Sequence, residues 1–279
     1  MNILIIGLGS IGQRHLRNIK KIIPNSRIFA FRRKFSSPTL SNNNNVQKIS
    51  LQKKFNINYL KSLKNLKKYK IDSAIICSPS SFHIKEAIIL LKQKISVFIE
   101  KPLGTNLKNI NVLKKIANNS NQTSMVGFQL KFCPIINYLK KIISQEKFGK
   151  INFVSIHHGE HIKNFHKYEN YRNLYASKKK LGGGVVLTQI HEIDYMLFIL
   201  EGFEIKRIVS DTQKVSNLDI DVEDISSSVL RFENKKKEKI ICNLHINYLE
   251  IPRKRKIEIL FEKAKVVADL VKQEILIFK

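Results

Sequence analysis

Long apolar segments and cysteines are both scarce in this 279-residue sequence. No apolar run approaches the roughly 20 residues that a membrane-spanning helix needs, so we expect no integral membrane protein. The N-terminus lacks the basic segment and small-residue cleavage site of a secretory signal, and we expect no signal peptide. The three cysteines (Cys77, Cys133 and Cys242) are odd in number and widely spaced, which argues against a disulfide framework or a zinc site. The sequence therefore predicts reduced thiols and a cytoplasmic location.

Acidic residues are scarce in the first half of the chain. Residues 1–150 hold 28 Lys and Arg against 4 Asp and Glu, whereas residues 151–279 hold 22 against 18. One interpretation of the formal net charge of +28 is nucleic-acid binding. The alternative is a lysine-rich solvated surface whose positive field also serves an anionic cofactor. The basic residues are scattered and not clustered with aromatics, so we favour the second interpretation and expect no nucleic-acid partner.

The first fifteen residues carry the most informative motif. An apolar run at 3–6 leads into GLGSIG at 7–12, and a helical pattern follows. A strand, G-x-G-x-x-G and a helix form the dinucleotide-binding fingerprint. In that fingerprint Gly7 permits the tight turn, Gly9 lets the backbone approach a pyrophosphate, and Gly12 lets the helix pack close to the strand. The pyrophosphate would lie at the helix N-terminus, where the dipole favours an anion. The alternative is a glycine-rich turn without a ligand.

The end of the second expected strand, at 28–31, bears on which nicotinamide cofactor fits. NAD-binding folds carry an acidic residue about 20 residues past the glycines, while an arginine there suits the 2′-phosphate of NADP. This sequence has Arg32 and Arg33 at that place, and no Asp or Glu before Asp72. The sequence therefore favours NADP over NAD. The alternative is that both arginines are ordinary surface charge.

The remaining pattern predicts an α/β protein of two domains. Strands and helices alternate up to about residue 125, which predicts a doubly wound parallel sheet with right-handed crossovers, a Rossmann domain of residues 1–125. Residues 36–50 are expected to form a loop, and 51–69 basic helical segments. Residues 126–279 contain alternating segments typical of an open, mostly antiparallel sheet, with a helical run at 185–200. We expect this α+β domain to bind substrate and to form a homo-oligomer through its sheet.

The sequence resembles the Gfo/Idh/MocA oxidoreductases, the family of glucose–fructose oxidoreductase and inositol dehydrogenase. The resemblance rests on GLGSIGQRH at 7–15, CSPSSFH at 77–83, EKPLG at 100–104 and GGGVVLTQIHEIDYMLFI at 182–199. The sequence is similar to family members associated with surface-polysaccharide and nucleotide-sugar pathways. The resemblance implies hydride transfer between a nicotinamide cofactor and a carbon of a sugar or nucleotide-sugar. A catalytically inactive nucleotide-binding sensor or scaffold of the same fold is the alternative.

The resemblance also implies roles for individual residues. Lys101 matches the family's active-site lysine, and His191 matches the histidine that exchanges a proton with the substrate hydroxyl. Thr188 stands where many relatives have an aspartate; helical spacing would still place it on one face with His191. Asp194 is assigned to a cap or a packing contact. The residues expected at the cofactor are Gly7, Gly9, Ser10, Ile11, Gly12, Arg32, Arg33, Ser78, Pro79, His83, Glu100 and Lys101.

Two further groups are weaker candidates. Tyr171, Arg172 and Tyr175 precede the triple glycine and, with Thr188, could bind a sugar or its phosphate; a surface loop is the alternative. Four histidines follow closely on one another, at positions 157, 158, 161 and 166. His157 and His158, as neighbours on a strand, point to opposite faces, and neither a cysteine nor a clean H-x-x-x-H pattern on a helix supports a metal site, so we expect no metal.

Overall fold

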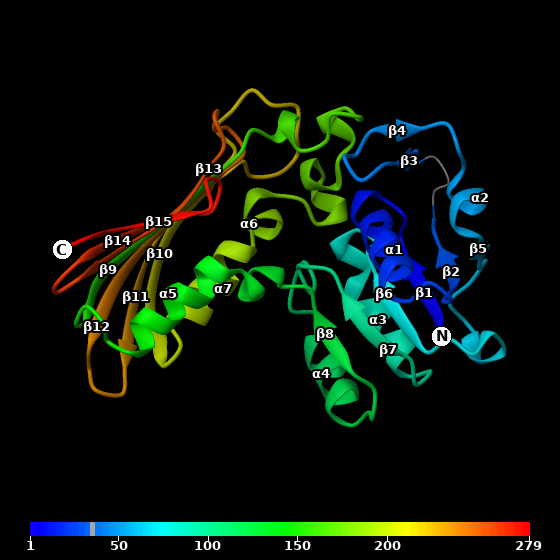
Figure 1. The fold of residues 1–279 in the computed structure, drawn as a ribbon, viewed down its shortest axis with the longest axis horizontal. Helices are drawn as coiled ribbons and strands as arrows, with labels where there is room; N and C mark the ends of the chain where they lie inside the picture. The colour runs from blue at the N-terminus through cyan, green and yellow to red at the C-terminus, as the bar shows by residue number, and fades with distance from the viewer. Residues whose placement is uncertain (34–36) are drawn as a thin grey trace. The chain divides into compact units, whose positions relative to one another are not determined.

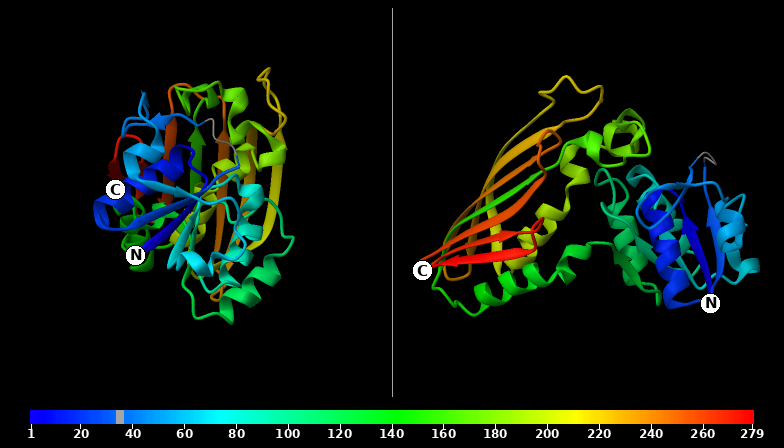
Figure 2. Two further views of the ribbon diagram at one scale, coloured as in Figure 1. Left: turned by 90° about the vertical axis from the view of Figure 1, so that its right-hand side faces the viewer. Right: turned by 45° about the horizontal axis from the view of Figure 1, so that its top comes forward.

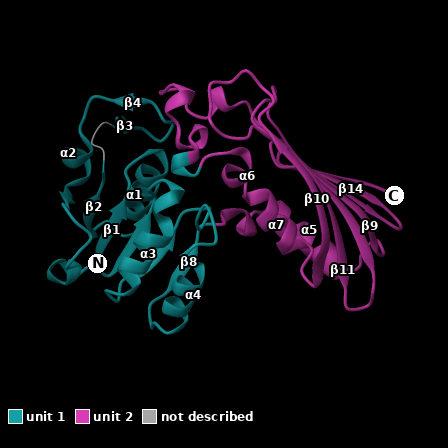
Figure 3. Cartoon of the chain, turned by 180° about the vertical axis from the view of Figure 1, so that it is seen from behind, with its two compact units in different colours: residues 1–127, 180–182 teal, residues 128–179, 183–279 magenta. Residues whose placement is uncertain are grey.

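The computed structural model describes residues 1–33 and 37–279, and its chain divides into two compact units. Unit 1 comprises residues 1–127 with 180–182, and unit 2 comprises residues 128–179 with 183–279 (Figure 3). Each unit has a hydrophobic core of its own. No helix among the described residues is long and apolar enough to cross a membrane.

Unit 1 is built on a six-stranded sheet in the order β5-β2-β1-β6-β7-β8, in which every neighbouring pair is parallel (Figure 1). The strands are β1 (Asn2–Ile6), β2 (Arg27–Phe31), β5 (Ile57–Tyr59), β6 (Ser73–Ile76), β7 (Ser96–Ile99) and β8 (Ser124–Val126). The helices are α1 (Ser10–Ile22), α2 (Leu51–Phe55), α3 (His83–Leu91) and α4 (Ile110–Asn118). The predicted parallel sheet is confirmed.

Both faces of this sheet are covered, which explains the unbroken apolar run of β1. Ile3 and Ile5 pack with Leu16 of α1 on one face. Leu4 and Ile6 pack on the other face in a cluster that also contains residues of α3 and α4. The unit is therefore doubly wound, and its parallel strands all end at the edge that carries the glycine turn.

One local expectation for unit 1 was wrong, and another was right only in part. The loop expected at 36–50, of which residue 36 lies outside the described residues, contains a hairpin of β3 (Thr39–Leu40) and β4 (Val46–Gln47). The buried Gln13 side chain holds it, accepting from the Leu40 amide at 2.8 Å. The helical segments expected at 51–69 are confirmed in α2, but the stretch also contains strand β5, too short to show a period, and a 3₁₀ turn at Leu66–Tyr69.

Unit 2 is built on a seven-stranded sheet in the order β10-β11-β12-β9-β13-β14-β15, antiparallel except for the pair β12 and β9. The strands are β9 (Ile151–Gly159), β10 (Phe203–Gln213), β11 (Ile225–Asn234), β12 (Lys239–Asn247), β13 (Lys254–Phe261), β14 (Lys265–Asp269) and β15 (Glu274–Phe278). This confirms the expected mostly antiparallel sheet. The sequence reading missed β14 and β15, which are five residues each.

Helices cover one face of the unit 2 sheet and leave the other bare (Figures 1 and 2). They are α5 (Pro134–Ser144), α6 (Val185–Thr188) and α7 (His191–Ile199). Tyr195 and Met196 of α7 are fully buried against Phe232 and Ile259 of the sheet. On the bare face, side chains such as Val229 are exposed. The sheet is also open, as expected, because its two edge strands, β10 and β15, do not pair with each other.

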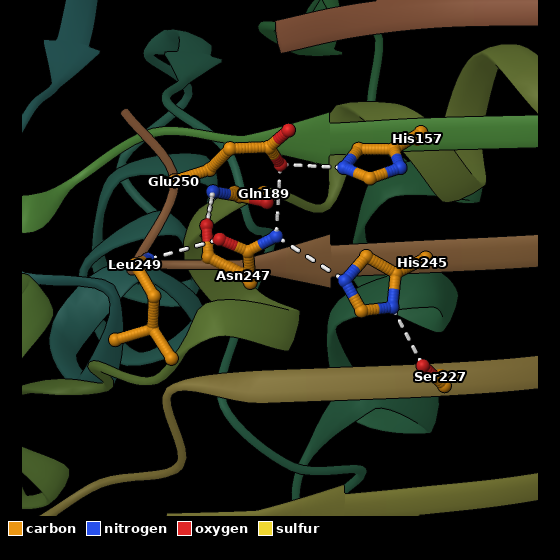
Figure 4. Close-up of polar contacts among 7 residues, drawn as sticks. All are labelled: His157, Gln189, Ser227, His245, Asn247, Leu249 and Glu250. Atoms are coloured by element: carbon orange, nitrogen blue, oxygen red, sulfur yellow. Dashed lines mark hydrogen bonds and ion pairs between the residues drawn. The ribbon is translucent and has the colours of Figure 1, made fainter. Parts of the chain in front are cut away.

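The helical run expected at 185–200 is interrupted. Helix α6 ends at Thr188, and α7 begins at His191. The buried Gln189 side chain between them donates to the backbone carbonyl of Asn247 at 2.9 Å (Figure 4). Thr188 and His191 consequently do not lie on one face of a single helix. Their relative placement is set by a contact with the end of β12 instead.

Candidate active site

The glycine turn of unit 1 has the geometry of an anion cradle. Gly7 has φ +87°, and a Cβ there would lie 2.6 Å from the Cys77 carbonyl oxygen. A Cβ on Gly12 would overlap the Gly7 carbonyl, whereas a Cβ on Gly9 would meet nothing within 4 Å. The first turn of α1 contains no acidic residue. The backbone thus packs tightly below the turn and leaves open space at a helix N-terminus, which fits the diphosphate of a dinucleotide cofactor.

Arg33 and Ser78, both expected at the cofactor, are joined by a residue that the sequence reading missed. Arg33 Nη2 lies 2.7 Å from Glu86 Oε1, and the Ser78 hydroxyl donates to Glu86 Oε2 at 2.5 Å. The Arg33 guanidinium also lies over the Phe82 ring, 4.1 Å from its centroid. Glu86, on α3, is 1% exposed. Its only signal in the sequence is its place as one of four acidic residues in the basic half.

His83 connects the two loops that follow β6 and β7. Its Nδ1 lies 2.8 Å from the Pro102 carbonyl oxygen and its Nε2 2.7 Å from that of Ser78. The ring is 1% exposed. Both ring nitrogens face backbone carbonyls, so His83 acts as a structural link between these two loops. The Lys101–Pro102 peptide bond at the end of this link is cis.

Glu100 and Lys101 follow β7 at the carboxyl end of the parallel sheet. Glu100 Oε1 lies 2.7 Å from His15 Nε2, and Oε2 accepts from the Lys101 amide at 3.2 Å. Burial opposes ionisation of Glu100, but the hydrogen bond and charge of His15 and the charge of Lys101 outweigh it and lower the pKa of the carboxyl. Lys101 itself is half-buried. His15 belongs to the GLGSIGQRH motif, but the sequence alone does not indicate its contact with Glu100.

His191 belongs to unit 2, where it is the first residue of α7. It is 8% exposed, and its ring meets that of Phe128 edge-on at 6.1 Å between centroids. Thr188, the last residue of α6, is 9% exposed. Asp194, one turn into α7, pairs with Lys131 at 2.9 Å. Asp194 was expected to be a cap or a packing contact, whereas the structure places it in this ion pair.

A buried ionic cluster holds the first turn of α7 on the sheet. Glu192, fully buried beside His191, pairs with Arg255 of β13 at 2.7 Å and with His158 of β9 at 3.0 Å. Burial opposes ionisation of Glu192, but the charge of Arg255 and the hydrogen bond from His158 lower the pKa of this carboxyl to about 2. The sequence reading missed Glu192 and Arg255, which lie 63 residues apart.

The clustered histidines do not converge. His157 and His158 point to opposite faces of β9, as expected: His158 faces Glu192, while His157 Nε2 lies 2.5 Å from Glu250. Figure 4 shows His157 and His245 side by side on the bare face, with Asn247 and Glu250 beside them. Within residues 1–33 and 37–279 no group of three or more His, Cys, Asp or Glu is arranged to hold a metal ion.

The substrate candidates lie in the 3₁₀ turns Tyr171–Asn173 and Tyr175–Ser177 of unit 2. Arg172 Nε lies 2.7 Å from Asp219 Oδ2, and the Tyr171 hydroxyl accepts from the Asp219 amide at 3.3 Å. Gly183 packs on this segment, since a Cβ there would lie 2.6 Å from the Tyr175 carbonyl. The Arg172 charge is thus already paired. Acidic and apolar residues alternate at 219–223, and this pattern was the sequence signal for an acidic partner of Arg172.

Two family models match this chain. One, described as an oxidoreductase family with an NAD-binding Rossmann fold, matches residues 1–128. The other, the Gfo/Idh/MocA C-terminal domain, matches residues 136–267. Together they cover most of both units.

Curated relatives match at low identity. Glucose-6-phosphate 3-dehydrogenase of Bacillus subtilis is 25% identical over 130 residues, covering 47% of this chain and 37% of that protein. Myo-inositol 2-dehydrogenase of Thermotoga maritima is 24% identical over 241 residues, covering 84% of this chain and 66% of that protein. The chain thus spans little more than a third of the first relative's length.

Solved structures share the fold. The WlbA dehydrogenase of Bordetella pertussis, solved with NADH and UDP-GlcNAcA, has a TM-score of 0.81 at 18% identity, covering 100% of this chain and 80% of that one. Myo-inositol 2-dehydrogenase of Lactobacillus plantarum has a TM-score of 0.75 at 20% identity, covering 96% and 76%. The glycine turn, the two-unit architecture and the matching models lead to one conclusion: the chain belongs to the Gfo/Idh/MocA family of oxidoreductases.

Proposed function

We propose that this protein is an NAD(P)-dependent oxidoreductase that transfers a hydride between a nicotinamide cofactor and a CH–OH carbon of a sugar or nucleotide-sugar. The observation that carries the proposal is the glycine turn before α1, whose backbone leaves room for a diphosphate at a helix N-terminus. In this proposal residues 1–125 bind the dinucleotide, and residues 126–279 bind the substrate. The relative solved with UDP-GlcNAcA supports an activated sugar as the substrate class.

The cofactor would supply or accept the hydride, so the protein must orient the carbon and move a proton. We assign its binding to the twelve residues named for it above, among which Gly7, Gly9 and Gly12 shape the turn. We further propose that NADPH is preferred, because Arg32 and Arg33 follow β2 where an acid would suit NAD. Glu86 supports this by holding Arg33 beside the carboxyl end of the sheet.

We assign the proton chemistry to Lys101 and His191. Lys101, at the carboxyl end of β7, would stabilise negative charge on the substrate oxygen through its ammonium group. His191 would accept or return the hydroxyl proton, because imidazole changes charge near neutral pH. Thr188 and Tyr175 would contact the sugar. Tyr171 and Arg172 would contact it only where the substrate displaces Asp219 from the guanidinium.

We also propose that the protein forms a homo-oligomer through the bare face of the unit 2 sheet. Large apolar side chains are exposed along that face, which is a mark of an interaction surface. They include Val209, Val229, Ile241, Leu260, Leu276 and Phe278. Sedimentation at several protein concentrations measures this association, and a monomer at all of them would contradict it.

The decisive experiment measures cofactor reduction at 340 nm with a panel of UDP-sugars and free sugars, with NADP⁺ and NAD⁺ in parallel. Turnover of a sugar supports the proposal. Cofactor binding without turnover of any sugar would favour the alternative, a nucleotide-binding sensor, for which Thr188 without a carboxylate is the supporting observation. Retention on nucleic acid, but not on a nicotinamide column, would contradict both.

A further inference from the structure

His15 links the cofactor helix to the loop that carries Lys101. It lies on α1, one turn beyond the glycine turn, and its Nε2 is 2.7 Å from Glu100 Oε1. The ring meets Phe98 of β7 edge-on at 5.2 Å between centroids. The side chains of His15 and Glu100 are 20% and 14% exposed. The contact is therefore mostly shielded from water, and it spans 85 residues of sequence.

Glu100 uses its two carboxylate oxygens in two directions. Oε1 faces His15 on α1, while Oε2 accepts the backbone amide of Lys101 at 3.2 Å. Hydrogen bonds to a charged acceptor are shorter and stronger than neutral ones. A single carboxylate thus connects α1, at whose N-terminus the diphosphate would lie, with the peptide that carries the proposed active-site lysine.

We propose that His15 is a positioning residue for Lys101, acting through Glu100; this rests on the proposed function. In the free protein, His15 holds the Glu100 carboxylate and thereby the backbone at Lys101. The lysine is then placed relative to the same helix that places the cofactor. Because hydride and proton must act on one carbon and its oxygen, a small displacement of the lysine lowers the rate without preventing cofactor binding.

The experiment compares His15→Leu, which removes the hydrogen bond, with His15→Gln, whose amide nitrogen can still donate to Glu100. Asn18→Leu, an exposed change on the same helix, is the matched control. Three quantities are measured: hydrogen exchange of the 100–104 segment without ligand, the Kd for NADPH by fluorescence, and kcat with the sugar that the panel identifies.

We expect His15→Leu to speed exchange of the 100–104 segment and to lower kcat by roughly 10- to 100-fold, with the Kd for NADPH changed by less than about 3-fold. His15→Gln should recover most of both losses, and Asn18→Leu should match the wild type. Unchanged exchange and kcat in His15→Leu would overturn the proposal. So would a Gln variant as impaired as the Leu variant, because the ring and not the hydrogen bond would then matter.

The two proposals fail in different ways. If the wild type turns over no sugar, the proposed function fails, while the exchange measurement still decides whether His15 holds the 100–104 segment. If the wild type is active and His15→Leu retains both its exchange pattern and its kcat, the positioning role fails and the proposed function stands.

Discussion

Arg33 and Glu86 form an ion pair of 2.7 Å that joins the segment after β2 to helix α3. The carboxylate is almost fully buried, whereas the arginine side chain is 41% exposed. Arg33 thus has two roles. Its guanidinium balances the buried charge of Glu86, and we propose that it also binds the 2′-phosphate of NADPH. Replacement of Arg33 is therefore expected to affect stability as well as cofactor binding.

Replacing Arg32 with alanine should weaken NADPH binding and leave NADH binding nearly unchanged. Replacing Arg33 should do the same and also lower stability by roughly 1–3 kcal/mol, because Glu86 loses its partner. Fluorescence titration and urea unfolding measure the two effects. The double change Arg33→Ala with Glu86→Gln should recover stability but not NADPH affinity. Equal losses for NADPH and NADH would contradict the phosphate assignment.

Lys101→Met should still bind NADPH through the other residues assigned to it, and it should lose turnover by roughly 10²–10⁴-fold, because the methionine cannot donate to the substrate oxygen. Steady-state kinetics and cofactor titration measure the two effects separately. Lys108→Met, on an exposed neighbouring loop, is the control and should leave both unchanged. Wild-type turnover in Lys101→Met would remove this lysine from the mechanism.

His191→Asn should keep the fold and the cofactor and lose most turnover. The wild-type pH–rate profile should show an ionisation near neutrality, and the variant should lack it, since asparagine does not titrate there. A second variant, Thr188→Asp, restores the carboxylate that many relatives have at this position. If the site is catalytic, this variant should keep the wild-type activity or exceed it. If the wild type turns over no sugar and His191→Asn only destabilises the protein, the histidine is a core residue. The result would then favour the alternative of a nucleotide-binding sensor.

Glu192 predicts a specific acid sensitivity. A carboxyl whose pKa falls from 4.5 to about 2 on folding contributes about 3 kcal/mol of stability. Because the folded value is the lower one, this contribution is complete above about pH 4.5 and is lost as the pH falls towards 2. Glu192→Gln should be less stable at neutral pH, and its stability should change less across that range.

Urea unfolding at a series of pH values measures this dependence. Glu160→Gln is the matched control, because Glu160 pairs with Arg253 at 3.1 Å in a more exposed setting. Exposed pairs contribute at most about 1 kcal/mol, so the control should follow the wild type. A Glu192→Gln variant with the same dependence as the wild type would show that the carboxylate is not the group responsible.

The sequence by itself determined the features that depend on neighbours along the chain. The apolar run of β1 and the glycines at 7, 9 and 12 indicated a strand, a turn and a helix, because period and backbone freedom are local properties. The same reasoning failed for β5, whose three residues are too few to show a period, and it did not find β14 and β15. It also failed at Gln189, because a contact with β12 interrupts an otherwise regular helical pattern.

Only the tertiary structure decided which charges are paired. Glu86 meets Arg33, Glu100 meets His15, and Glu192 meets Arg255. The partners lie 53 to 85 residues apart, and no local sequence pattern links one partner to the other. What distinguishes them is burial, since a carboxylate removed from water must find a cation or a donor, and the fold alone brings that partner within reach.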